Sequence, residues 1–102
     1  MIRGDIGYMV KLDIPKLKML VFENDWCAQC YTERPIIHRL AIKYHDQLEV
    51  EVLNADNNPL MVKKYNVLTA PSIILIKNDE MVERISRFID QNQLETVIRY
   101  YL

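Results

Sequence analysis

The only two cysteines of this 102-residue chain lie three positions apart, in the segment Trp26-Cys27-Ala28-Gln29-Cys30. The preceding residues, 17–22, are short and apolar as a buried strand is, and apolar residues recur at helical spacing over residues 36–44. The pair therefore lies at a strand-to-helix junction, where free N–H groups and the positive end of the helix dipole favour a thiolate on Cys27. Cys30, one turn further along, is within reach to close a disulfide. This pattern predicts a site of thiol–disulfide exchange.

A metal site is the first alternative for the two thiols. Zinc in a structural site takes four ligands, and only His38 and His45 are left to complete Cys27 and Cys30. Two histidines seven residues apart on one helix are separated by about 10 Å, too far for a single zinc ion. We therefore expect no metal and no zinc site within one chain, although an iron–sulfur cluster bridging two chains stays open. The sequence has no flavin or nicotinamide motif, so no cofactor is expected either.

Composition limits the other classes of function. The chain is of the commonest single-domain size, so residues 1–102 are expected to form one domain, and 50% hydrophobic residues suffice for a core. A formal net charge of −1 offers no basic field for nucleic acid. The longest strongly apolar run, residues 73–76, is far short of a membrane span, and the first residues lack the apolar core of a secretory signal. The cytoplasm is the expected compartment, where paired cysteines are more often catalytic or metal-binding than structural.

The hydrophobic pattern predicts an α/β domain with a mixed central sheet and helices on both faces. A strand over residues 8–12 would be separated from the strand over 17–23 by only four residues, too few for a helix, so the N-terminal βα unit is expected to be shortened or irregular. The remaining elements are expected in the order helix, strand, helix, hairpin, helix. Their expected ranges are 27–44, 48–52, 58–66, 72–77 with 81–88, and a last helix capped by Asp90 and Gln93.

Four segments in register make the chain resemble the thioredoxin family from about Leu17 to Leu102. The segment around the cysteines is similar to the family's active site, and Pro35 lies where thioredoxins have their helix-kinking proline. The other two segments are Leu53–Pro59, similar to the family's strand-to-helix turn, and Tyr65–Ser72, similar to the stretch that ends in the family's cis-proline. The resemblance implies the thioredoxin fold.

The resemblance also implies an activity and its residues. The Cys27 thiolate would attack a disulfide in a target protein, and Cys30 would then release the reduced target. Pro71 would follow a cis peptide, the backbone of Ala70 would pair with an extended substrate strand, and Trp26 would cover the disulfide and contact partners. The expected partners are disulfide-containing proteins and an external reductase such as thioredoxin reductase, with the chain itself a monomer.

Three departures from the family pattern bear on this mechanism. Val21 and Val52 stand where thioredoxins usually bury an Asp and a Lys, so no buried carboxylate is evident to take the proton from Cys30; water, Asp25 and Glu23 are the candidates, with Glu23 as the proton relay within the protein. Ala28-Gln29 replaces the common Gly-Pro between the cysteines, where residues tune the redox potential. Arg87 occupies a position that is usually glycine, where a cation could lower the pKa of Cys27 or have no role.

A second function remains open from the sequence. A thioredoxin-fold binding or scaffold module with little redox turnover would tolerate both the irregular N-terminus and the missing Asp–Lys pair. The intact set of Trp26, Cys27, Cys30 and Pro71 favours the oxidoreductase, because a scaffold has no physical need of it.

Overall fold

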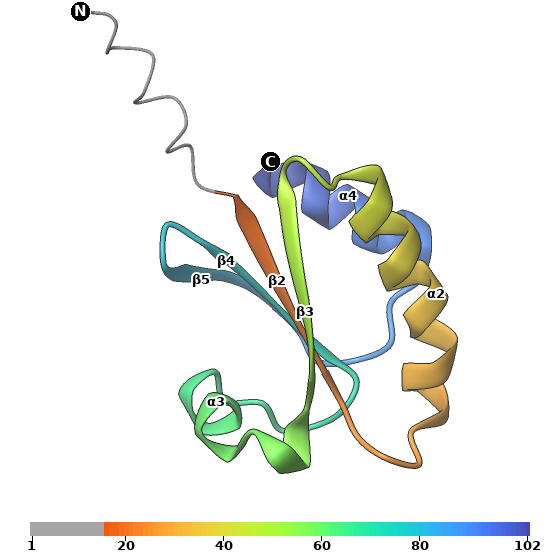
Figure 1. Cartoon of the computed structure of the whole chain (residues 1–102), viewed down its shortest axis with the longest axis vertical. Coiled ribbons are helices and arrows are strands. Elements are labelled where there is room, and N and C mark those ends of the chain that lie inside the picture. The colour runs from red at the N-terminus through yellow and green to blue at the C-terminus, as the bar shows by residue number, and fades with distance from the viewer. Residues whose placement is uncertain (1–15) are drawn as a thin grey trace, which may run out of the picture.

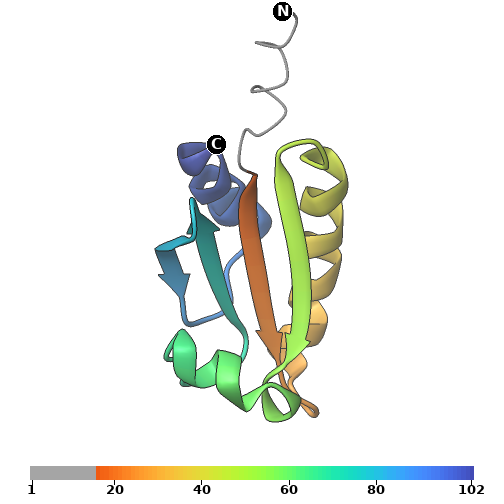
Figure 2. The same cartoon turned by 60° about the vertical axis from the view of Figure 1, so that its left-hand side comes forward.

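The computed structural model describes residues 16–102, which form a four-stranded mixed sheet with helices on both faces (Figure 1). The strand order is β3-β2-β4-β5, where β2 (Leu17–Glu23) pairs in parallel with β3 (Leu48–Asn54) and antiparallel with β4 (Ser72–Lys77). The last strand, β5 (Glu80–Ile85), pairs antiparallel with β4. Figure 2 shows the four strands side by side. The expected strand over residues 8–12 and the irregular N-terminal unit lie outside the described residues.

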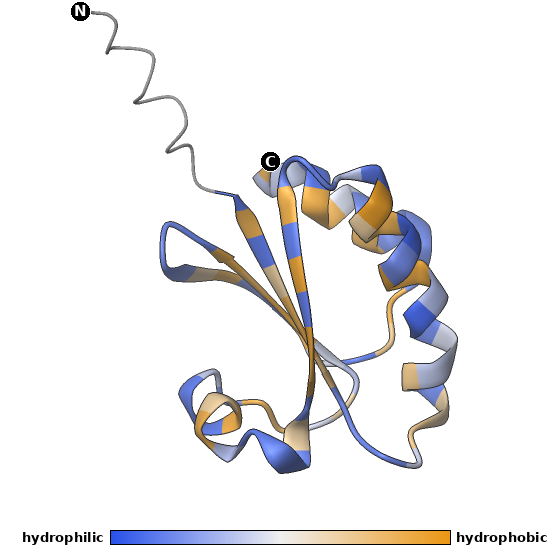
Figure 3. Ribbon diagram, in the orientation of Figure 1, coloured by the Kyte–Doolittle hydropathy of each residue, from blue (hydrophilic) through white to orange (hydrophobic). Residues whose placement is uncertain are grey.

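Alternation along the two central strands creates two separate cores. Odd-numbered residues of β2 and β4, such as Met19 and Leu75, pack with α2 (Ala28–Lys43) and α4 (Gln91–Tyr101). Even-numbered residues, such as Phe22 and Ile74, face a smaller cluster that includes Met61 and Val62 of α3 (Pro59–Lys64). Successive side chains of a strand point to opposite faces, so strands with long apolar runs, such as residues 19–22 and 73–76, must be covered on both sides. Figure 3 shows these strands as nearly continuous hydrophobic ribbons.

The helix that follows the cysteines begins with Cys27 as its N-cap and ends with Tyr44 as its C-cap, as the sequence predicts. It continues through Pro35, whose missing N–H leaves one carbonyl of the preceding turn without its helical partner. Its buried residues recur at intervals of three and four, and they are Cys30, Glu33, Ile36, Ile37 and Leu40. This stripe fixes which side of α2 faces the sheet.

The hairpin between β4 and β5 confirms the turn expected at Asn78 and Asp79, both of which have positive φ (54° and 65°). The second strand, however, ends at Ile85, so the expectation that it continues to Phe88 is wrong. Ile85 pairs with Ile73, and β4 begins only at Ser72, directly after Pro71. In this antiparallel pair, residues of β5 beyond Ile85 would have to pair with residues before β4 begins. Residues 86–90 therefore have no strand beside them and leave the sheet as an irregular segment.

Side-chain caps define the starts of two of the three remaining helical elements, and α3 begins without one. Asn54 accepts hydrogen bonds from the backbone of Asp56 and Asn57, and this produces a 3-10 turn, η2 (Ala55–Asn57), that the sequence did not indicate. Asp90 accepts from the backbone N–H of Gln93 at 2.9 Å, as expected of the N-cap of α4. Within residues 16–102 no helix combines the length and the hydropathy that a membrane crossing requires.

The buried stripe of α2 predicts unequal effects of two similar truncations on one helix. We expect Leu40→Ala to lower the free energy of unfolding by about 2–5 kcal/mol, because Leu40 is fully buried and its removal leaves a cavity. Ile42→Ala, at a 61% exposed position two residues away, should change it by no more than about 0.5 kcal/mol. Urea unfolding of both variants provides the test, and comparable losses would contradict the orientation of α2.

Candidate active site

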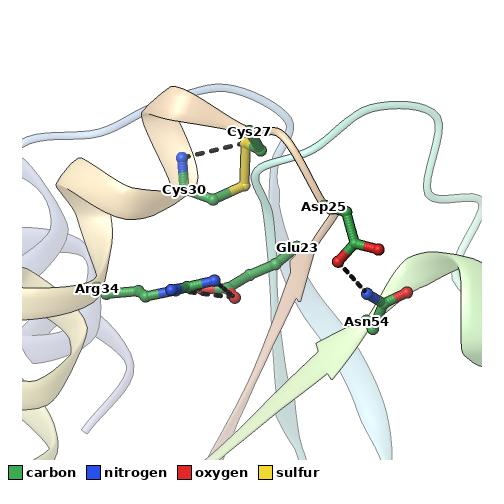
Figure 4. A network of polar contacts seen from close by, with 6 residues as sticks. All are labelled: Glu23, Asp25, Cys27, Cys30, Arg34 and Asn54. Carbon is green, nitrogen blue, oxygen red and sulfur yellow. Dashed lines mark hydrogen bonds and ion pairs between the residues drawn. A yellow bond between two sulfur atoms is a disulfide. The ribbon is translucent and has the colours of Figure 1, made fainter.

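Cys27 and Cys30 form a disulfide at the N-terminus of α2, with their Cα atoms 5.2 Å apart (Figure 4). The backbone N–H of Cys30 donates a hydrogen bond to Cys27 Sγ at 3.1 Å, so the sulfur itself caps the helix. The two sulfur-bearing residues differ in exposure: Cys27 is half-buried, whereas Cys30 is buried at 1% exposure. Unpaired N–H groups at a helix start stabilise negative charge on an adjacent atom, and Cys27 Sγ is the atom that receives it.

Trp26 enters the helix in a left-handed conformation, with φ of 63°. A positive φ is uncommon for a residue with a Cβ. The Trp26 side chain is completely exposed, so the expectation that it covers the disulfide is wrong. Tyr31, in the first turn of α2, is also 72% exposed rather than at a core position, with the Arg34 guanidinium 4.7 Å from its ring centre.

The peptide bond between Ala70 and Pro71 is cis, in agreement with the sequence resemblance. Pro71 is buried and Ala70 is half-buried, and two side chains secure the backbone around them. Ser72 Oγ donates to the carbonyl of Thr69 at 2.6 Å, and Thr69 Oγ1 donates to the carbonyl of Ser86 at 3.1 Å. The second bond ties this turn to the irregular segment that follows β5.

Glu23, at the end of β2, is held by Arg34 of α2 (Figure 4). Arg34 Nε lies 3.1 Å from both carboxylate oxygens, and its Nη2 donates to Oε1 at 2.9 Å. Such forked, charge-assisted bonds are the strongest kind available to a carboxylate. Asp25 is exposed instead, and it accepts a hydrogen bond from Asn54 Nδ2 at 3.3 Å. No sequence pattern indicates the Glu23–Arg34 pair, because the two residues are eleven positions apart and belong to different elements.

The two valines that replace the family's charged pair lie in different environments. Val21 is buried in the core shared with α2, whereas Val52, its register partner on β3, is 52% exposed. The argument that a buried charge would be costly therefore applies to Val21 and not to Val52. Val52 borders a shallow depression between α2 and β3 that is also lined by Glu23, Arg34 and His38.

Comparison with known proteins decides the family. The family model for thioredoxin matches residues 8–100. The thioredoxin of Buchnera aphidicola is 31% identical over 91 residues, which cover 89% of this chain and 84% of that protein. The chain belongs to the thioredoxin family.

Solved structures agree with this assignment. A structure described as thioredoxin-2, a component of the malaria parasite protein secretion machinery, superimposes with a TM-score of 0.79 at 27% identity and covers 84% of each chain. The Drosophila thioredoxin Deadhead, at 19% identity and a TM-score of 0.81, shows the same fold. With its Cys27–Cys30 pair, this thioredoxin-family protein is a thiol–disulfide oxidoreductase.

One buried acidic residue close to the cysteines was missed by the sequence reasoning. Glu33 of α2 is only 1% exposed, and its Oε2 accepts a hydrogen bond from the backbone N–H of Ile89 at 3.2 Å. Its other oxygen, Oε1, is buried and has no hydrogen-bond partner among the described residues. The signal was present in the sequence, because Glu33 lies three residues after Cys30 and three before Ile36, on the stripe that the helical period assigns to the core.

Burial determines the protonation of Glu33. Loss of water raises the pKa of its carboxyl group from the ordinary 4.5 to about 7, the hydrogen bond from Ile89 lowers it, and the nearby charge of Glu23 raises it. Arg87, the other charged residue singled out in the sequence, is exposed and donates a hydrogen bond to the carbonyl of Phe88 at 3.2 Å. Among residues 16–102, no three His, Cys, Asp or Glu side chains converge so as to hold a metal ion.

The raised pKa of Glu33 predicts a pH dependence of stability in this thioredoxin. Since the folded-state pKa lies above the unfolded one, the contribution of Glu33 is complete below about pH 4.5 and is lost as the pH rises to about 7. Glu33→Gln cannot ionise and should not show this loss. We expect the wild type to lose on the order of 1–2 kcal/mol relative to the variant across that range, after allowing for screening near the surface. Urea unfolding of both proteins at several pH values measures the difference, and parallel curves would contradict an ionisable buried Glu33.

Proposed function

We propose that this protein reduces disulfides in protein substrates by a two-step exchange through Cys27 and Cys30. The unequal exposure of the two cysteines is the observation that carries the proposal. Half-buried Cys27 is the one that a substrate sulfur can reach, and Cys30, at 1% exposure, can react only with Cys27. The order of attack follows from this difference in access.

Cys27 acts as the nucleophile because its sulfur receives the Cys30 N–H at the start of α2. The same donor favours the thiolate when the disulfide is reduced, and the thiolate is the form that attacks a disulfide. In the first step the Cys27 thiolate bonds to one substrate sulfur, and the other substrate sulfur leaves as a thiolate that takes a proton from water. In the second step Cys30 attacks Cys27, and the substrate departs fully reduced.

The surface around the cysteines is suited to an extended polypeptide. Trp26 offers a fully exposed apolar ring next to Cys27, and Ala70 and Pro71 supply a rigid turn with backbone groups for a substrate strand. We propose these three residues as the substrate-binding site. Neither the net charge of −1 nor the scattered basic residues suit nucleic acid, and we propose none as a partner.

Continued reduction needs a supply of electrons from outside the chain. We propose an external reductase such as thioredoxin reductase as the donor, and the cytoplasm as the compartment, where disulfides are kept reduced. The protein would act as a monomer, because one chain holds both cysteines of the exchange.

The exchange mechanism predicts opposite behaviour of two serine variants. Cys30→Ser should accumulate a covalent mixed disulfide with a disulfide-containing protein such as insulin, because the second attack is lost. Cys27→Ser should form no adduct and show no insulin reduction with dithiothreitol as the electron donor. Non-reducing electrophoresis and the turbidity of reduced insulin provide the two readouts.

The scaffold alternative makes a different prediction in the same assays. A binding module with little redox turnover would give neither an adduct with Cys30→Ser nor insulin reduction by the wild type. An adduct formed by Cys27→Ser instead would reverse the assigned roles of the two cysteines.

A further inference from the structure

We propose that Glu33 takes up the proton that Cys30 loses when its sulfur attacks Cys27. The inference rests on the proposed function, since it concerns the second step of that exchange. The proton acceptor of this chain would therefore lie on α2, because Val21 of β2 stands where thioredoxins usually have a buried Asp.

Position on the helix brings Glu33 toward Cys30. Both residues lie on the buried face of α2, each at 1% exposure, and they are three positions apart. Side chains at that spacing have Cβ atoms about 5–6 Å apart. Because each Cα–Cβ bond of a helix is tilted toward its N-terminus, the Glu33 Cβ is directed toward the turn that contains Cys30.

The hydrogen bonding of Glu33 leaves one oxygen for a proton. Oε2 is occupied by the Ile89 N–H, which fixes the orientation of the carboxyl group. Oε1 is buried without a partner among residues 16–102, and an unpaired buried polar atom costs free energy. A proton arriving on Oε1 would neutralise a charge that burial disfavours.

Glu23, one of the three candidate acceptors that the sequence suggested beside Asp25 and water, is less suited to this role. Both of its oxygens accept from Arg34, so protonation would break a forked ion pair. The Glu23 carboxylate, paired with Arg34, raises the pKa of Glu33 and so favours a proton there.

The pKa of Glu33 suits a general base that accepts the Cys30 proton. A general base works best with a pKa close to the working pH, and burial brings the pKa of Glu33 to about 7. Glu23 from β2 is the charged residue that acts on Glu33, and it is itself paired with Arg34, the next residue along α2. Arg87 and Asp90, which lie within two residues of Ile89 in the sequence, are exposed, so water screens their charges.

The step balances in atoms and electrons. The Cys30 thiol gives its proton to Glu33 Oε1, and its sulfur bonds to Cys27 Sγ. The bond between Cys27 and the substrate sulfur breaks, and the substrate leaves with the electron pair as a thiolate. The substrate sulfur is reduced, the Cys27–Cys30 pair is oxidised, and Glu33 later returns the proton to the thiolate or to water.

Stopped-flow reaction of the reduced protein with the aromatic disulfide DTNB separates the two steps. Attack by Cys27 releases a first thionitrobenzoate at a rate proportional to the DTNB concentration. Attack by Cys30 on the mixed disulfide releases a second, at a rate independent of that concentration. The second rate, measured from about pH 6 to about pH 9, is the readout of the proposal, because a purely structural role of Glu33 would not change its pH profile.

We expect Glu33→Gln to slow the second release at pH 7 by at least about tenfold while the first stays within about twofold. The midpoint of the pH profile should move from about 7 in the wild type toward the value at which a thiol ionises unaided, about 8.5 or above. Glu33→Asp, which keeps a carboxyl group, should recover part of the rate. Glu51→Gln, at an exposed position on β3, is the matched control for the loss of one negative charge and should behave as the wild type.

Each contrary outcome identifies what has failed. An unchanged second release in Glu33→Gln, or slowing in Glu23→Gln alone, overturns the role of Glu33 and leaves the two-step exchange intact. A wild type that releases no second thionitrobenzoate overturns both. If Glu33→Gln does not fold, the wild-type profile and Glu33→Asp decide, and a wild-type profile with no midpoint near 7 overturns the proposal.

Discussion

The packing of one face of α2 against the sheet determines the rest of the site. Its buried stripe begins at Cys30 and continues through Glu33 to Leu40, so the orientation that seats the apolar residues also seats the second cysteine and a carboxyl group. The same packing leaves Cys27 at the N-cap, where the start of the helix supplies a donor to its sulfur. The difference in exposure between Cys27 and Cys30 therefore follows from the way in which one face of α2 packs on the sheet.

The carboxyl groups of Glu23 and Glu33 lie in different environments. Glu23 is bound by a bidentate arginine from α2, and Glu33 is kept apart from water with a single backbone donor. Neighbouring groups with such different environments divide the tasks of holding charge and exchanging protons. This division offsets the loss of a buried acid at position 21, where a valine fills the core instead.

The sequence predicted the parts of this structure that depend on local periodicity. The strand 17–23, the helix that starts at the cysteines and the Asn78-Asp79 turn follow from patterns of two or 3.6 residues and from turn chemistry. The end of β5 at Ile85 was not predictable, because it depends on where the partner strand begins. No pattern reveals the positive φ of Trp26 or the exposure of its side chain, and the Glu23–Arg34 pair requires tertiary contact. Glu33 could have been found, since helical spacing alone places it among core residues.

The titration of Glu33 in the wild-type protein tests the central claim most directly. Carbon-13 NMR of its carboxyl group, assigned by the signal that disappears in Glu33→Gln, should show a midpoint near pH 7 in the oxidised protein. Reduction of the disulfide should move that midpoint to higher pH, because a nearby thiolate disfavours a second negative charge. A midpoint near the ordinary 4.5 that is the same in both redox states would show that Glu33 is neither poised for proton transfer nor linked to the cysteines.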